Sequence, residues 1–160
     1  MTASLVEDDL SRRLRNADPT KIRSLRPEID NDLARVVKVY DGDTYTILFS
    51  MQGQLRKCSV RVKGVDCPEI RGRGSVEKAV AMAIRDLVKT FLMNRICRIT
   101  AESVDKYGRL LARVINDDGI DLTEYLLQNG LARPYAGESR TPFSLDELEV
   151  ITTQLERIRC

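Results

Sequence analysis

The sequence predicts an α+β fold that is mainly β, a five-stranded barrel with about three helices. Three observations predict it: strand-like segments over residues 34–65, one long helical repeat over residues 75–93, and further strand-like and helical segments from residue 95 onward. The chain has 160 residues, 42% of them hydrophobic and 31% charged. One domain with a substantial buried core therefore accounts for most of the chain.

The first three strands are expected to form an antiparallel meander. Residues 34–40 and 44–51 are rich in Val, Ile, Tyr and Thr, and Asp41-Gly42 between them is a strong turn signal. A glycine turn then leads into residues 55–65, where apolar and polar side chains alternate. Arg61 falls on the polar side of this alternation, which places it on the outer face of the meander.

The long repeat over residues 75–93 has apolar side chains at every third or fourth position, which predicts a helix with one buried stripe. Residues 95–102 and 109–116 have the composition of two more strands. The three stretches together complete the set of five strands and provide the first helix of the barrel.

Two further helices are expected near the C-terminus. Residues 122–128 look helical and end at Asn129-Gly130, which is typical of a helix C-cap. Ser144 and Glu147 form a predicted capping box for a last helix over residues 145–158. Three strands, a helix, two strands and then helices is the element order of an OB-fold barrel, an architecture that commonly binds single-stranded nucleic acid or oligosaccharide.

Residues 1–33 are predicted to be a charged arm, and residues 34–160 the barrel with its C-terminal helix. The arm contains two prolines and a segment, residues 5–14, that could form a short helix. Its mixed charges favour a solvated or partner-docking segment over a nucleic-acid contact. The start of the chain lacks the apolar region of a secretory signal, and no stretch is long enough to cross a bilayer. An intracellular protein without a membrane partner is expected.

The composition excludes several kinds of chemistry. The chain contains no histidine, which rules out Ser-His-Asp triads and histidine-based zinc or nuclease sites. The net charge is only +2, so nucleic acid would have to be recognised by local charge. The four cysteines have no C-x-x-C spacing and are expected to be free thiols: Cys58, Cys67, Cys97 and Cys160.

Three acidic residues mark a candidate site. Asp43 follows the first turn, and Asp66 and Glu69 follow the third strand-like segment, so all three can meet at one rim of the barrel. Neighbouring carboxylates repel each other unless a cation is bound between them, and oxygen ligands of this kind suit Ca²⁺ or Mg²⁺. Glu69 is the natural candidate to orient or deprotonate an attacking water. Taken singly, an Asp at such a turn or a loop Glu is more often an ordinary turn or surface residue.

Two arginines could join this group. Arg61 precedes Asp66 by five residues, so a regular pleat would place the two side chains on opposite faces. A bend near Gly64 would bring them together, and glycine often marks such a bend. Arg109 begins a strand after the turn at residues 105–108 and can reach across the same rim. Two guanidinium groups are suited to binding a phosphate, although either arginine alone could be an ordinary surface residue.

Four motifs occur in a fixed order: Asp-Gly-Asp-Thr at residues 41–44, Val-Arg-Val-Lys-Gly-Val-Asp-Cys-Pro-Glu at 60–69, Asp-Lys-Tyr-Gly-Arg at 105–109, and Leu-x-x-Gly-Leu-Ala at 127–132. In this order they resemble the staphylococcal nuclease family, over about residues 34–135. The resemblance implies an OB-fold barrel that hydrolyses DNA and RNA phosphodiesters with one Ca²⁺ ion and leaves 3′-phosphorylated products. Its expected partners are DNA and RNA, with single strands preferred.

The resemblance also assigns roles to residues. The catalytic residues it implies are Arg61, Glu69 and Arg109. The calcium ligands it implies are Asp43, Asp66 and the backbone carbonyl of Cys67. Asp41 and Thr44 are expected to lie behind these ligands and to support their positions. The substrate-binding residues it implies are Lys106, Tyr107 and, by a less direct match, Tyr135.

Two departures from the family pattern stand out. The segment from Ile70 to the long helix is shorter than the family's active-site loop, and residues 1–33 replace the export signal of secreted members. Neither affects the catalytic set. The main alternative is a catalytically silent nuclease-like domain that binds nucleic acid or protein. A plain OB barrel that binds strands by stacking is a third reading, which the absence of Trp and an aromatic content of 5% disfavour.

Overall fold

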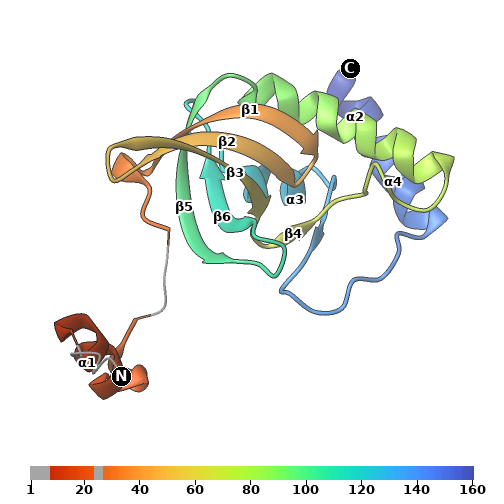
Figure 1. Ribbon diagram of the computed structural model, residues 1–160. Helices are drawn as coiled ribbons and strands as arrows, with labels where there is room; N and C mark the ends of the chain where they lie inside the picture. Colours follow the sequence, from red (N-terminus) through yellow and green to blue (C-terminus); the bar gives the residue numbers. More distant parts are fainter. Residues whose placement is uncertain (1–7, 24–26) are drawn as a thin grey trace.

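The structure, a computed structural model, describes residues 8–23 and 27–160 and confirms the α+β barrel (Figure 1). The strands of the closed barrel follow the order β1-β2-β3-β6-β5. Their bounds are β1 Leu33–Asp41, β2 Thr44–Met51, β3 Gln54–Val62, β5 Ile96–Val104 and β6 Leu110–Ile115. Only β3 and β6 pair in parallel; the other neighbours, including β1 and β5, are antiparallel.

The third strand ends earlier than the sequence suggested. It stops at Val62, because Gly64 has a φ of +88°, a left-handed conformation that interrupts the pleat. The chain continues as the short strand β4, Val65–Asp66, which leaves the barrel and pairs with β7, Arg133–Pro134. The bend expected near Gly64 is therefore present, and it places Asp66 in a separate two-stranded sheet.

The core lies inside the barrel and under its helices. Inward-facing side chains alternate along β1 and β2, and the largest fully buried ones include Tyr45, Ile47 and Ile99. Helix α2, Ser75–Leu92, contributes its predicted apolar stripe to this core. Helix α4, Leu145–Arg159, lies against α2 on the same side of the barrel (Figure 1).

The two C-terminal helices begin as the sequence predicted. Helix α3, Leu122–Gln128, starts at Asp121, whose carboxylate accepts the backbone N–H groups of Thr123 and Glu124. Helix α4 has the predicted capping box, in which Ser144 and Glu147 exchange side-chain and backbone hydrogen bonds. Both helices are therefore stabilised where their first N–H groups lack intrahelical partners.

The N-terminal part of the described chain contains helix α1, Asp9–Asn16, and the 3₁₀ turns Pro19–Lys21 and Asp30–Asp32. The start of the helix predicted over residues 5–14 lies outside the described residues. No residue of α1 is buried, whereas Ile29 packs into the barrel core. Contacts with the barrel therefore begin a few residues before β1. No helix in the described ranges is long and apolar enough to span a membrane.

Candidate active site

The turn between β1 and β2 holds Asp43 at the rim of the barrel. The Tyr45 hydroxyl donates a hydrogen bond to the Gly42 carbonyl at 2.6 Å, and the Val62 N–H donates to the Asp43 carbonyl at 2.9 Å. Thr44 Oγ1 donates to the Asp43 carboxylate at 3.2 Å. These bonds connect the turn to β2 and β3, so the Asp43 carboxylate has a fixed and buried position.

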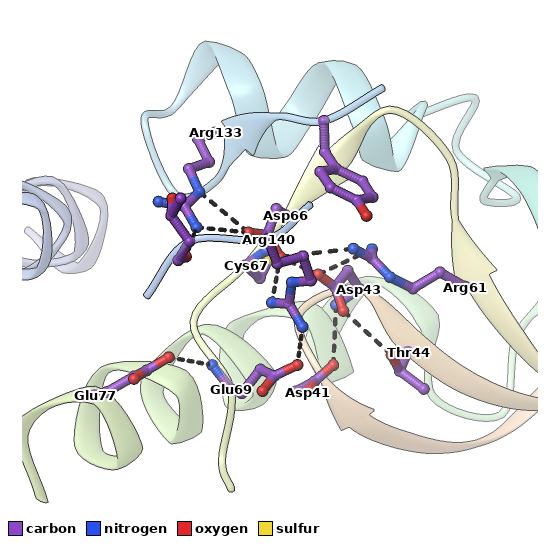
Figure 2. A network of polar contacts seen from close by, with 12 residues as sticks. Asp41, Asp43, Thr44, Arg61, Asp66, Cys67, Glu69, Glu77, Arg133 and Arg140 are labelled. Atoms are coloured by element: carbon purple, nitrogen blue, oxygen red, sulfur yellow. Dashed lines mark hydrogen bonds and ion pairs between the residues drawn. The ribbon is translucent and has the colours of Figure 1, made fainter. Parts of the chain in front are cut away.

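Arg61 joins the two buried aspartates (Figure 2). Its Nη1 lies 3.0 Å from Asp43 Oδ2, and its Nη2 lies 3.6 Å from Asp66 Oδ1. The strand alternation predicted an outward-facing Arg61, and this prediction was wrong: the side chain is only 7% exposed. It is buried because β3 reaches the end of the barrel here. Within the described chain, Nη2 is a buried nitrogen without a hydrogen-bond partner.

Asp66 and Cys67 follow the bend at Gly64. The Cys67 N–H donates to Asp43 Oδ2 at 2.8 Å, which links the two acidic segments through the backbone. Burial, followed by the charge of Asp43, raises the pKa of the Cys67 thiol well above its usual value. The thiol is therefore neutral, and only the backbone carbonyl of Cys67 could serve a hard metal ion.

Asp41 supports Asp43 in two ways. Its Oδ1 accepts the Asp43 backbone N–H at 3.3 Å. Burial, and then the neighbouring charge of Asp43, raise the pKa of Asp41 to about 8. Asp41 is consequently a neutral acid near pH 7, so it does not add a further negative charge beside Asp43.

The donor set fits a hard divalent cation in its chemistry. Asp43 and Asp66 present carboxylate oxygens next to the Cys67 backbone, and no soft ligand is ionised nearby. Among the described residues, no group of three or more His, Cys, Asp or Glu side chains is arranged to hold an ion. The carboxylates are neutralised instead by three arginines, a sign that the cluster requires compensating positive charge.

Glu69 lies on the loop that leaves β4, and Glu77 of α2 holds that loop in place. The Glu77 carboxylate is buried and accepts the backbone N–H groups of Glu69 and Arg73, each at 3.1 Å. Gly72 packs so closely on it that an added Cβ would lie 2.2 Å from Glu77 Cδ. Glu77 thus fixes the backbone of Glu69, whose side chain points toward Arg140 and the acidic group (Figure 2).

Two arginines from the C-terminal side complete the cluster. Arg133 of β7 donates to Asp66 Oδ2 from Nε at 3.1 Å and from Nη2 at 2.9 Å. Arg140 donates from Nη2 to Asp66 Oδ1 and from Nη1 to Glu69 Oε1. Figure 2 shows the Arg140 guanidinium between these two acids. Both oxygens of Asp66 are therefore bound to arginine.

A large hollow of about 890 Å³ lies beside the acids. Its lining includes the remaining residues that the family resemblance implied: Arg61, Glu69, Lys106, Tyr107, Arg109 and Tyr135. Arg109 Nε donates to Asp105 Oδ2 at 2.7 Å, which leaves both terminal nitrogens of Arg109 without a partner in the described chain. Tyr107 is 72% exposed, and the Tyr135 ring lies 5.7 Å from the Arg61 guanidinium carbon.

Three contributors to the site were missed in the sequence: Glu77, Arg133 and Arg140. Glu77 has the position of an ordinary acidic residue in the first turn of a helix, so nothing in the pattern separates it from a surface glutamate. Arg133 directly follows the Gly-Leu-Ala motif, which was the one available signal. Arg140 lies in a loop without periodicity, and its contacts depend entirely on how that loop folds.

Comparison with known proteins identifies the family of the chain. The model of the family described as "Staphylococcal nuclease homologue" matches residues 59–154, more than half of the chain. An "Uncharacterized endonuclease" of Escherichia coli O157:H7 is 28% identical over 111 residues, which are 68% of this chain and 64% of that protein.

Fungal relatives are also similar. The "Probable endonuclease lcl3" of Aspergillus flavus is 25% identical over 146 residues, 73% of this chain and 53% of the relative. That of Penicillium rubens is 24% identical over 143 residues, 72% and 49% respectively. The chain thus spans about half to two thirds of the length of these relatives. By its family match and its barrel, the chain belongs to the staphylococcal nuclease homologues.

Proposed function

We propose that this chain is a calcium-dependent, sugar-nonspecific nuclease that hydrolyses phosphodiester bonds of DNA and RNA to 3′-phosphorylated products. The observation that carries the proposal is the Arg61 guanidinium, held between two buried aspartates, with no hydrogen bond from Nη2 in the described chain. A buried N–H group without a partner is unfavourable, and a phosphate oxygen is the partner that a guanidinium binds best. Arg109 lines the same hollow, and within the described residues its terminal nitrogens make no hydrogen bond.

The residues provide the groups that hydrolysis needs. Glu69 orients a water molecule and accepts its proton as the water oxygen bonds to phosphorus. The bond from phosphorus to the 5′-oxygen then breaks, and the 5′-oxygen leaves with the electron pair and is protonated. Arg61 and Arg109 bind the phosphate oxygens, where negative charge builds up in the five-coordinate transition state. Arg61 is the better preorganised of the two because Asp43 and Asp66 fix it.

Asp43, Asp66 and the Cys67 carbonyl are the residues that would hold the calcium ion. When bound, such an ion supplies Lewis-acid polarisation of the phosphate and activation of water. The protein's own part is to keep both aspartates in place. Thr44 and the Cys67 N–H do so for Asp43, while Asp41 stays neutral.

The shape of the hollow supports cleavage within a strand. Two smaller recesses, of about 210 and 330 Å³, adjoin the main hollow and share Glu69 and Arg140 with it as lining residues. The 330 Å³ recess is also lined by Arg71 and Arg73. The recesses therefore extend the space next to the acidic group and supply further arginines for the phosphates of a bound strand. Tyr107 and Tyr135 are placed to stack on unpaired bases, which favours single strands over duplex.

The competing function is a catalytically silent domain that only binds nucleic acid or protein. Loss of an acid or arginine from the catalytic set would favour it, but Asp43, Asp66, Glu69, Arg61 and Arg109 are all present. The enzyme is the better reading for that reason.

The experiment is cleavage of denatured DNA, duplex DNA and RNA, each with calcium and with a chelator, by wild type and Glu69→Gln. Glu149→Gln, an exposed glutamate on α4, is the matched control. We expect calcium-dependent cleavage, faster on denatured DNA, that leaves 3′-phosphate ends and falls by at least ~10² in Glu69→Gln, the scale of general-base catalysis. Glu149→Gln should match wild type. Binding without cleavage by the folded wild type would establish the silent domain instead.

A further inference from the structure

Arg140 holds two acids that the nuclease reaction needs free. It lies after β7, and its two terminal nitrogens bind different carboxylates, Asp66 Oδ1 and Glu69 Oε1. Figure 2 shows this guanidinium in the space between the two acids. A guanidinium group is protonated throughout the physiological pH range. The group is therefore a permanent cation at this position.

Asp66 has no oxygen free for another cation in this arrangement. Arg133 occupies Oδ2, and Arg140 occupies Oδ1, which also lies 3.6 Å from Arg61. Asp66 is only 1% exposed, so water does not compete strongly for these oxygens. A metal ion bound to Asp66 would lie close to these guanidinium groups, and the repulsion between like charges favours displacement of one of the arginines.

The two candidate arginines are anchored very differently. Arg133 also binds Glu147 at 3.3 Å and the Thr141 carbonyl, and its guanidinium carbon lies 3.9 Å from the centre of the Phe143 ring. Arg140, in the described chain, is held only by Asp66 and Glu69. Its side chain is 36% exposed against 24% for Arg133. Arg140 is therefore the arginine that can leave without disturbing the fold.

We propose that Arg140 is a built-in counter-cation of the active site: it occupies Asp66 and Glu69 until a divalent cation displaces it, and so sets the cation concentration at which the site is loaded. The inference rests on the proposed function for the identity of the cation as calcium. Release of Arg140 frees the Glu69 carboxylate in the same event. It also leaves a third guanidinium at the hollow that Arg61 and Arg109 line.

The proposal is tested by measuring calcium affinity with isothermal titration calorimetry in the absence of nucleic acid. Arg140→Gln should bind calcium at least about tenfold more tightly than wild type, the scale of a charge-assisted hydrogen bond lost to competition. Arg140→Lys keeps the charge but cannot bridge both acids, and its affinity should fall between the two. Arg113→Gln is the matched control, because Arg113 binds the buried Asp121 beside α3, away from the site. Its calcium affinity should equal that of wild type.

Thermal melting supplies a second readout. Without calcium, Arg140→Gln should melt below wild type because Asp66 and Glu69 lose their shared partner. Saturating calcium should raise the melting temperature of Arg140→Gln more than that of wild type. If Arg140→Gln does not fold without calcium, Arg140→Lys provides the comparison with wild type.

Equal or weaker calcium binding by the Arg140 variants would overturn the proposal, and so would an absence of calcium binding by both wild type and variants. Calcium binding by Arg140→Gln alone would support the proposal in its strongest form. Cleavage is scored separately. If the protein cleaves nucleic acid but its calcium affinity is the same in the Arg140 variants, only the counter-cation proposal is refuted. If calcium displaces Arg140 but no cleavage occurs, only the nuclease proposal is refuted.

Discussion

Asp43 and Asp66 lie on either side of Arg61, yet the protein holds them by different means. Asp43 belongs to a turn between two barrel strands and is fixed by bonds to β2, β3 and the Cys67 backbone. Asp66 has left the barrel, and its carboxylate is held by the side chains of Arg133 and Arg140. We call the first the barrel half of the site and the second, with Glu69, the loop half.

The difference separates two tasks. The barrel half has short-range backbone anchors and suits preorganised charge, which is effective only when it does not move. The loop half depends on a partly exposed arginine and can exchange one cation for another. Rigidity for the chemistry and adaptability for cation loading are thus assigned to different segments.

The largest expected effects come from loss of either arginine proposed to bind phosphate at the hollow, Arg109 or Arg61. Arg109→Ala should reduce the cleavage rate by roughly 10²–10³, because one preorganised donor to the transition state is lost. Calcium affinity by titration should stay unchanged, since Arg109 contacts Asp105 and not the acidic cluster. Arg61→Ala should lose at least as much rate with the fold retained. Wild-type turnover in either variant would remove that arginine from the mechanism.

A smaller effect is expected at the joint between the two halves. A Cβ on Gly42 would lie 2.7 Å from Ile84 Cγ2 and 2.8 Å from Cys67 Sγ, so Gly42→Ala should lower the free energy of unfolding by about 1–3 kcal/mol, the usual result of overpacking. Urea denaturation measures it. Adding Cys67→Ala removes one of the two clashes and should restore part of the loss. Strictly additive effects of the two substitutions would mean that this contact does not join the halves.

The smallest effect is expected in the support of the loop half. Glu77→Gln replaces one of two carboxylate acceptors with an amide, which weakens the hold on the Glu69 and Arg73 N–H groups. We expect kcat to fall by about tenfold with KM nearly unchanged, because Glu77 acts only through the position of Glu69. Steady-state kinetics on denatured DNA measures the two constants. A change in KM alone would assign Glu77 to substrate binding.

The sequence predicted the barrel half far better than the loop half. Asp43, Thr44 and the strand that carries Arg61 follow from periodicity and turn chemistry, which are local properties. The bend at Gly64 was also readable, because glycine tolerates a positive φ. The burial of Arg61 could not be predicted, because alternation along a strand does not reveal where a barrel ends.

The sequence could not predict the roles of Glu77, Arg133 and Arg140 for a different reason. Each acts on a residue that is distant along the chain or in another element, as when Arg140 reaches Asp66 and Glu69 across more than seventy residues. The partner of such a side chain depends on the path of an irregular loop, and no periodic pattern encodes that path. The assignments of individual residues to catalysis and calcium binding remain predictions for experiment.

The most direct test of this two-part site compares calcium affinity in Asp43→Asn and Arg140→Gln by titration under identical conditions. Asp43→Asn removes a proposed ligand and should weaken binding, whereas Arg140→Gln removes the competing cation and should strengthen it. Opposite shifts from wild type would show that the acids bind the ion and that Arg140 competes for it. Unchanged affinity in both variants would place calcium elsewhere and contradict the account.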